Sequence, residues 1–155
     1  MRRVLAFVAF ALAITIDRLT KLWALRLPEP GPFLFGDILT TTHHHNFGLI
    51  ANLPLPLPLI FVVVAAVMLL VISALRTADK KQDILDMIAL ALILGGAVSN
   101  LWDRITWGYV FDWILLFRTS IINVADTAVG LGLLLYIAHR WNPTLRNEEV
   151  HTPKS

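Results

Sequence analysis

Four long apolar segments dominate the pattern of hydrophobic and polar positions along the chain. They cover about residues 4–25, 57–75, 84–102 and 121–137, and short polar or proline-rich stretches separate them. Each is close to the ~20 residues that a helix needs to cross the hydrocarbon core of a bilayer. The pattern therefore predicts an all-α integral membrane protein with four transmembrane helices.

The first segment also has features of a secretory signal, because Arg2 and Arg3 precede an apolar run that contains small residues. The apolar character resumes after Asp17 and Arg18, and removal of the run would discard half of a spanning segment. We therefore expect a retained helix rather than a cleaved signal.

The connections between the apolar segments differ in character. Residues 27–56 begin and end with prolines and are rich in aromatic and β-branched residues, which predicts a small extracytoplasmic β-hairpin or sheet. Residues 76–83 are expected to form a polar turn in which Asp83 caps the next helix. Residues 103–120 form a second extracytoplasmic loop in this interpretation. Residues 1–141 would be one membrane domain, and residues 142–155 a polar, disordered cytoplasmic tail.

Composition agrees with a membrane protein, since 57% of the 155 residues are hydrophobic and only 15% are charged. The formal net charge of +2 comes from short cationic clusters beside apolar runs, not from a basic stripe with interleaved aromatics, so nucleic acid is not expected as a partner. The chain has no cysteine, which excludes disulfides, thiolate metal sites and a cysteine nucleophile.

The distribution of cations predicts the orientation of the helices. Eight of the lysines and arginines fall on the side of the two termini and five on the other side, where Arg18, Lys21 and Arg104 lie within acidic motifs. Cytoplasmic loops carry an excess of Lys and Arg, so both termini should be cytoplasmic. The aspartate-bearing ends of the helices then face the outer surface of the membrane.

Ionisable residues inside the apolar segments are functional candidates, because a charge in the bilayer costs a few kcal/mol. Asp17 and Lys21 are four residues apart on one helical face, which favours an ion pair that supports the structure or orients a neighbour. Lys21 could also form a Ser–Lys pair with Ser99 or Ser120, but the charge of Asp17 would hold the lysine protonated and disfavour it as a base.

The third segment places polar residues on one helical face and small residues beside them. Gly96, Asn100, Asp103 and Arg104 share this face, and Gly95, Ala97 and Ser99 are small enough for close helix contact. A buried Asn100 amide would need hydrogen-bond partners. Asp103 and Arg104 could be a cap and a surface pair at the water boundary; for Asp103 we favour structural support over catalysis.

Asp112 and Asp126 are the strongest candidates for chemistry. Separately, Asp112 could be a lone interfacial acid and Asp126 an acid favoured by a helix N-terminus. The 13 residues between them, however, allow the two side chains to converge. Two adjacent carboxylates cannot both ionise easily, so one would keep a proton while the other acts as a base. This arrangement predicts peptide-bond hydrolysis at a membrane surface without a metal or a covalent intermediate.

Two other interpretations are weaker. Residues 43–45 are three consecutive histidines, but on an extended strand they would point to alternating faces, so a metal site there is not favoured. A proton-coupled or non-catalytic membrane protein could use the same carboxylates. A transporter would need acids distributed across the bilayer, whereas here they gather on one side.

Five motifs occur in the order seen in the lipoprotein signal peptidases, also called signal peptidase II, and the chain resembles this family over about residues 17–130. The motifs are residues 17–21, 46–48, 95–104, 110–112 and 123–126. The resemblance implies a multi-pass aspartic endopeptidase of the bacterial inner membrane whose active site faces the periplasm. It implies cleavage of a prolipoprotein signal peptide immediately before a cysteine that carries diacylglycerol, with no metal or cofactor. Membrane lipids are the other expected partner, and a monomer is expected.

The resemblance also assigns roles to individual residues. Asp112 and Asp126 match the catalytic pair. Asp17 and Lys21 match a structural motif. The positions that match site support or substrate contact are Asn46, Gly48, Asn100, Asp103, Arg104 and Asn123. Three residues within or next to these motifs depart from the family pattern, namely Ser99, Trp113 and Ile122.

Overall fold

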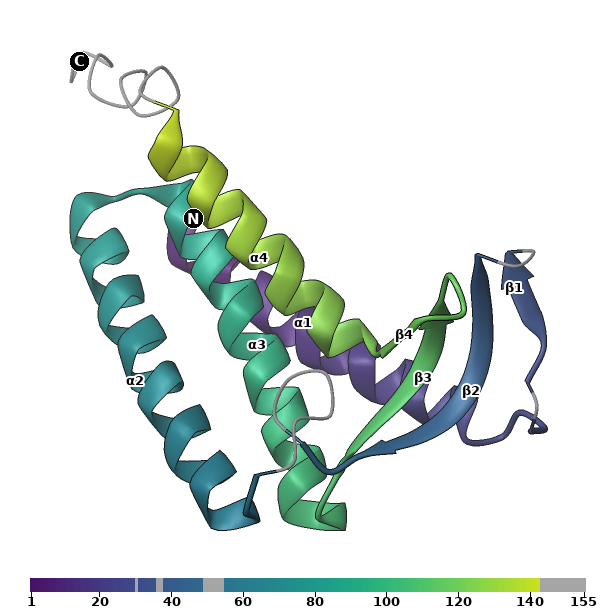
Figure 1. Cartoon of the computed structure of the whole chain (residues 1–155). Coiled ribbons are helices and arrows are strands. Elements are labelled where there is room, and N and C mark those ends of the chain that lie inside the picture. The colour runs from purple at the N-terminus through teal and green to yellow at the C-terminus, as the bar shows by residue number, and fades with distance from the viewer. Residues whose placement is uncertain (30, 36–37, 49–54, 143–155) are drawn as a thin grey trace.

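The computed structural model describes all residues except 30, 36–37, 49–54 and 143–155. The described part contains a bundle of helices with a small sheet at one end (Figure 1). The helices are α1 (Arg2–Ala24), α2 (Leu57–Lys81), α3 (Ile84–Trp107) and α4 (Val124–Trp141). The strands are β1 (Phe33–Phe35), β2 (Leu39–Asn46), β3 (Val110–Leu116) and β4 (Ser120–Ile122).

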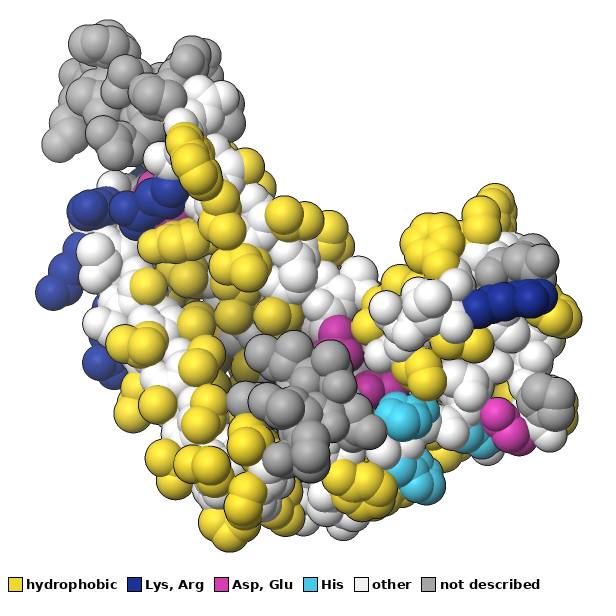
Figure 2. Space-filling model, in the orientation of Figure 1, with side chains coloured by type: hydrophobic (Ala, Val, Ile, Leu, Met, Phe, Trp, Pro, Cys, Tyr) yellow, Lys and Arg dark blue, Asp and Glu magenta, His cyan; other side chains and the backbone are white. Residues whose placement is uncertain are grey.

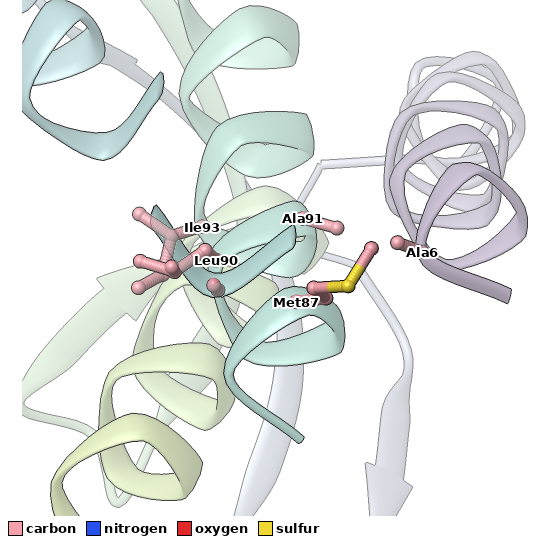
Figure 3. Close-up of a cluster of buried hydrophobic side chains, with 6 residues drawn as sticks. Ala6, Met87, Leu90, Ala91 and Ile93 are labelled. Atoms are coloured by element: carbon pink, nitrogen blue, oxygen red, sulfur yellow. The ribbon is translucent and has the colours of Figure 1, made fainter. Parts of the chain in front are cut away.

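Helix α3 lies at the centre of the bundle and packs against the other three helices. A Cβ atom on Gly95 would lie 2.7 Å from the carbonyl oxygen of Phe10 on α1, and a Cβ on Gly96 would collide with the carbonyl oxygen of Ala125 on α4. The expected close helix contact at Gly95 is therefore confirmed, and Gly96 makes a second one on α4. Buried apolar side chains also form a cluster between the helices, which includes Ala6 of α1 and Met87 and Leu90 of α3 (Figure 3).

Two helices in the described residues are long and apolar enough to cross a membrane, α2 with 25 residues and α3 with 24. Only 6% of the apolar window of α2 is buried, against 44% of that of α3. Hydrophobic side chains cover much of the bundle surface in Figure 2, as expected for helices that face lipid. The protein is thus mostly helical with a small antiparallel sheet, while the crossing of the membrane by all four helices stays a prediction.

The sheet has the order β1-β2-β3-β4 with antiparallel neighbours, and it joins two distant parts of the chain. The predicted β-structure in residues 27–56 is confirmed by β1 and β2. The expected connection at residues 103–120 has more regular structure than the sequence predicted, since α3 continues to Trp107 and β3 follows from Val110. Phe111 and Trp113 of β3 are buried in a small core beneath the sheet, so these aromatic residues do not belong to a solvent-exposed loop.

The ends of the helices also differ from the predicted ones. The expected polar turn at residues 76–83 is mostly helical, because α2 continues to Lys81 and only Gln82 adopts a left-handed conformation, with φ of 60°. Asp83 caps α3 as expected, accepting a hydrogen bond of 3.0 Å from the backbone of Asp86. Helix α4 begins at Val124 because residues 120–122 form β4. The predicted disordered tail lies outside the described residues beyond Asn142.

Candidate active site

Asp112 lies on β3 at the point where the sheet meets the helices. It pairs with His44 of β2, and Val110 pairs with Asn46, so Asp112 and Asn46 are diagonal neighbours on one face of the sheet. The Asn46 amide nitrogen donates a hydrogen bond of 2.9 Å to the Asp112 carboxylate. Asp112 is only 1% exposed, so its carboxylate is almost completely removed from water.

Asp126 lies in the first turn of α4 and forms a capping box with Asn123. The Asn123 side-chain oxygen accepts a hydrogen bond of 2.8 Å from the backbone nitrogen of Asp126, and an Asp126 carboxylate oxygen accepts one of 3.3 Å from the backbone of Asn123. The other carboxylate oxygen accepts a hydrogen bond of 2.8 Å from the amide of Asn100 on α3. Asp126 is therefore an acid in the first turn of a helix, the position expected if the helix N-terminus favours it. It also binds Asn100 of α3.

Asn123 connects the two aspartates. Its side-chain nitrogen donates a hydrogen bond of 2.6 Å to Asp112 and one of 3.1 Å to the Asn100 oxygen, while its backbone and side-chain oxygen bind Asp126. The expected convergence of Asp112 and Asp126 is therefore found, and Asn100 has the partners that a buried amide needs. Asp126 and Asn100 keep part of their surface exposed, and acidic side chains are visible where the helices meet the sheet (Figure 2).

The surroundings of Asp112 favour its protonated form. Burial, together with the negative charge of Asp126, raises the pKa of Asp112 to about 6, and the hydrogen bonds from Asn46 and Asn123 oppose this shift. A carboxylate with this pKa can exchange a proton near neutral pH. Since the two acids interact, their titration belongs to the pair.

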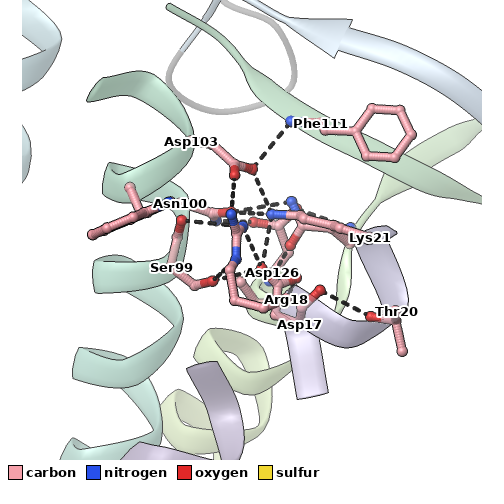
Figure 4. A network of polar contacts seen from close by, with 12 residues as sticks. Asp17, Arg18, Thr20, Lys21, Ser99, Asn100, Asp103, Phe111 and Asp126 are labelled. Carbon is pink, nitrogen blue, oxygen red and sulfur yellow. Dashed lines mark hydrogen bonds and ion pairs between the residues drawn. The ribbon is translucent and has the colours of Figure 1, made fainter. Parts of the chain in front are cut away.

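A polar network between α1, α3 and β3 supports this pair (Figure 4). The Lys21 ammonium lies 2.8 Å from Asp17 and 2.6 Å from Asp103, and 3.4 Å from the side-chain oxygen of Asn100. The expected Asp17–Lys21 ion pair is confirmed, but Lys21 also joins α1 to α3. Asp17 accepts a hydrogen bond of 2.9 Å from the backbone of Ala125, which fixes the first turn of α4 next to Asp126.

Asp103 and Arg104 are both buried, so the possibility of a cap and a surface pair is wrong. Asp103 accepts a hydrogen bond of 3.2 Å from the backbone of Phe111, the residue before Asp112. Arg104 donates one of 2.8 Å to the carbonyl of Gly48, and the Gly48 nitrogen donates one of 2.9 Å to Asn46. These contacts place the end of β2 beside the two aspartates.

The contacts of two members of the network were not predicted from the sequence. Arg18 lies 2.6 Å from Asp103 and donates a hydrogen bond of 3.1 Å to Ser99. Ser99, which departs from the family pattern, donates one of 2.6 Å to Asp17. The signal that could have identified Arg18 is its position as an ionisable residue inside an apolar segment.

The alternative sites receive less support. His43 lies 2.8 Å from the carbonyl oxygen of Ala24, and the His45 ring stacks on Tyr109 with centroids 4.1 Å apart. In the described residues, ligand-type side chains close enough to share a metal are Asp83, Asp86 and His139, at the opposite end of the bundle. Asp86 there binds His139 at 3.0 Å and Arg140 at 2.6 Å, an arrangement that already satisfies its charge.

Comparisons with known proteins agree on one family. A sequence profile described as "Signal peptidase (SPase) II" matches residues 9–142. Proteins named "Lipoprotein signal peptidase" from Clostridium tetani and Moorella thermoacetica are 30% and 33% identical to this chain. The alignments cover 84% and 80% of this chain and 88% and 84% of those proteins. A solved structure described as a bacterial membrane enzyme has a TM-score of 0.73 at 20% identity, over 97% of this chain and 93% of that one.

Proposed function

This chain belongs to the signal peptidase II family, and from that premise we propose that it removes the signal peptide of diacylglyceryl-modified prolipoproteins, cutting immediately before the lipidated cysteine. The family consists of aspartic proteases that process prolipoproteins in the bacterial membrane, so the chain is an aspartic endopeptidase. Membership of the family does not by itself specify the modified cysteine or the position of the cut, and these are what we propose.

Asp112 and Asp126 are the proposed catalytic pair. The ionised member takes a proton from a water molecule, whose oxygen attacks the scissile carbonyl carbon. The protonated member donates its proton to the carbonyl oxygen. The first aspartate then passes the proton that it took from water to the leaving amine as the C–N bond breaks, and the second aspartate regains a proton from a hydroxyl group of the intermediate as the carboxylic acid product forms. The shared contacts of both acids with Asn123 are the single observation that carries this assignment.

Asn46, Gly48 and Arg104 form the proposed substrate border of the site. Arg104 is held by the Gly48 carbonyl and attracts both catalytic carboxylates electrostatically. Removal of Arg104 would therefore alter both the position of the 46–48 segment and the charge balance of the pair. Asp17, Lys21 and Asp103 act through these residues, because they fix the first turn of α4 and the start of β3.

The proposed orientation places the site at the outer surface of the membrane and both termini in the cytoplasm. Exposed Trp23, Trp102 and Trp107 lie at the end of the bundle that carries the site, as expected for residues at a membrane interface. The cations Arg2, Arg3 and those near the end of α2 lie at the other end. The diacylglycerol chains would then stay in the outer leaflet while the scissile bond reaches Asp126.

The test is cleavage of a purified diacylglyceryl prolipoprotein by the purified protein in detergent. Mass spectrometry of the product should find the lipid-modified cysteine at the new N-terminus. The matched control is the same prolipoprotein without diacylglycerol, which should remain uncut. Equal cleavage of both substrates would refute the lipid requirement, and a cut elsewhere would refute the proposed position.

A further inference from the structure

An apolar groove lies at the end of the bundle opposite the aspartates, where α1 and α2 flank α3. Its volume is about 360 Å³. Met87 of α3 points toward Ala6 of α1, with Ala91 beside it, and these side chains form part of the groove wall (Figure 3). The other apolar side chains that line it are Phe7, Phe10, Leu75 and Leu94.

The charged residues that line this groove are mostly cationic. Arg3, Arg76 and Asp79 line it, and a neighbouring cavity of about 430 Å³ shares Arg3 and Asp79. Met1, Arg2 and Gln82 complete that second cavity, which is far more polar than the groove. An apolar groove thus adjoins a polar cavity, with Arg3 lining both and Arg76 on the groove side, which is the polarity of a site for an amphiphilic anion.

The single acid at this junction does not neutralise the cations. Asp79 is bound by Arg3 through two contacts of 2.8 and 2.9 Å, which use two of the three guanidinium nitrogens of Arg3. Arg76 is exposed, and Lys80 and Lys81 follow it in the last turn of α2. A positive charge therefore remains beside the groove.

We propose that this groove binds one anionic phospholipid, with an acyl chain between α1, α2 and α3 and the phosphate at Arg76 and Arg3. An uncharged or zwitterionic lipid could fill the apolar part but would gain less from the arginines. A soluble anion could use the arginines but would leave the apolar walls without a partner. The inference rests on the membrane setting and is independent of the peptidase assignment.

The experiment measures lipid retention by native mass spectrometry of the full-length protein purified in detergent. Phosphatidylglycerol and phosphatidylcholine with identical acyl chains are added at equal concentration. We expect phosphatidylglycerol to be retained preferentially. Arg76→Gln should weaken its retention about fivefold, equivalent to about 1 kcal/mol for one cation near an anionic headgroup.

Arg26→Gln is the matched charge control, since Arg26 is exposed beyond the other end of α1. Its retention of phosphatidylglycerol should equal that of the unmodified protein. Equal retention of both lipids, or equal losses in Arg26→Gln and Arg76→Gln, would overturn the proposal. Competition by glycerol phosphate would instead indicate a simple anion site and would also overturn it.

A second pair of variants tests the groove itself. Leu94→Trp should fill the groove and reduce retention, whereas Val62→Trp on an exposed face of α2 should not. Thermal unfolding of each variant establishes that it is folded. Undiminished retention by a folded Leu94→Trp variant would exclude the groove as the acyl-chain site. Because no arm uses a prolipoprotein, failure here would be distinct from failure of the proposed peptidase function.

Discussion

Asn123 shows how one residue can set the geometry of two carboxylates. Its side-chain nitrogen binds Asp112 while its oxygen and backbone nitrogen cap α4 and bind Asp126. The side chain therefore couples the position of the sheet to the first turn of a helix. An aspartate in the first turn of a helix is common in proteins, whereas Asn123 is an N-cap residue that also binds a second, buried acid.

Replacement of Asn123 by Ala should therefore affect stability and catalysis separately. Loss of the cap should lower the free energy of unfolding by about 1 kcal/mol. Loss of the Asp112 contact should additionally lower kcat for prolipoprotein cleavage. The matched control is Asp83→Ala, which removes the cap of α3 at the far end of the bundle. Similar destabilisation with unchanged kcat is expected there; equal losses of kcat in both variants would contradict the special role of Asn123.

The raised pKa of Asp112 predicts a cost to stability. A carboxyl group whose pKa rises on folding from 3.8 to about 6 binds more protons in the folded state, so its ionisation destabilises the protein as the pH increases through that range. Asp112→Asn should then raise the free energy of unfolding at pH 7 by about 1–2 kcal/mol. This gain is smaller than the pKa shift alone implies, because the substitution also alters the hydrogen bonds of residue 112.

Unfolding in detergent at several pH values measures this effect. The gain for Asp112→Asn should be complete above about pH 6 and should disappear below about pH 4, where the carboxyl group is neutral in both states. Asp79→Asn serves as the control, because this acid lies at the opposite end of the bundle. The quantity to compare is the gain in free energy of unfolding of Asp112→Asn over the unmodified protein. If this gain were no larger at pH 7 than at pH 4, the raised pKa would be contradicted.

The sequence identified Asp112 and Asp126 because ionisable residues are rare beside apolar segments, and because their motifs resemble those of a known family. It did not identify Arg18 or Ser99 as partners of Asp103 and Asp17. These contacts join α1 to α3 across about 80 positions of the chain. They depend on how one helix is rotated against the other, which a single sequence does not reveal.

At the scale of the elements, the helices were easier to predict than the sheet. Long apolar runs identify helices in a membrane, where every backbone group must be paired within the segment. Strand β3 is short and buried on both faces, so its residues lack the alternation of a half-exposed strand, and its aromatic side chains are equally typical of a membrane interface. Its partner β2 lies in a different loop, which only the folded chain brings next to it.

The contact between α3 and α4 depends on Gly96. A Cβ atom at this position would collide with the Ala125 carbonyl oxygen and lie 2.8 Å from a methyl group of Val129. Gly96→Ala should displace the first turn of α4, which contains Asp126, and reduce both thermal stability and the cleavage rate. Melting temperature and kcat are the readouts.

Gly130→Ala is the control for this substitution, because a Cβ on Gly130 would have no neighbour within 4 Å among the described residues. Alanine favours a helix by about 1 kcal/mol over glycine, so this variant should be as stable as the unmodified protein or more so. If Gly96→Ala behaved in the same way, the close packing of α3 on α4 would not position the site.

At the scale of the whole molecule, the two long connections at one end of the bundle contribute strands to a single sheet, and that sheet supplies Asp112. The sequence predicted a membrane protein with β-structure on this side, but it did not predict that residues 110–122 complete the sheet. The orientation inferred from cations and the four crossings are still predictions at this scale.

The absence of cysteine makes the orientation directly measurable. A single cysteine at Thr119, in the turn between β3 and β4, should react with a membrane-impermeant maleimide in intact spheroplasts. A cysteine at Lys81, at the end of α2, should react only after permeabilisation. The reverse pattern would invert the proposed topology, and labelling of both without permeabilisation would place these two ends on the same side.

The central claim is that Asp112 and Asp126 together activate water. Single-turnover cleavage of a purified diacylglyceryl prolipoprotein by Asp112→Asn and Asp126→Asn tests it most directly, with Asp79→Asn as the control. Each variant should fold and yet cleave at least about a hundredfold more slowly, the loss typical of a missing general acid or base, while the control should retain the full rate. A folded variant of either aspartate that cleaves within about tenfold of the unmodified rate would contradict the claim.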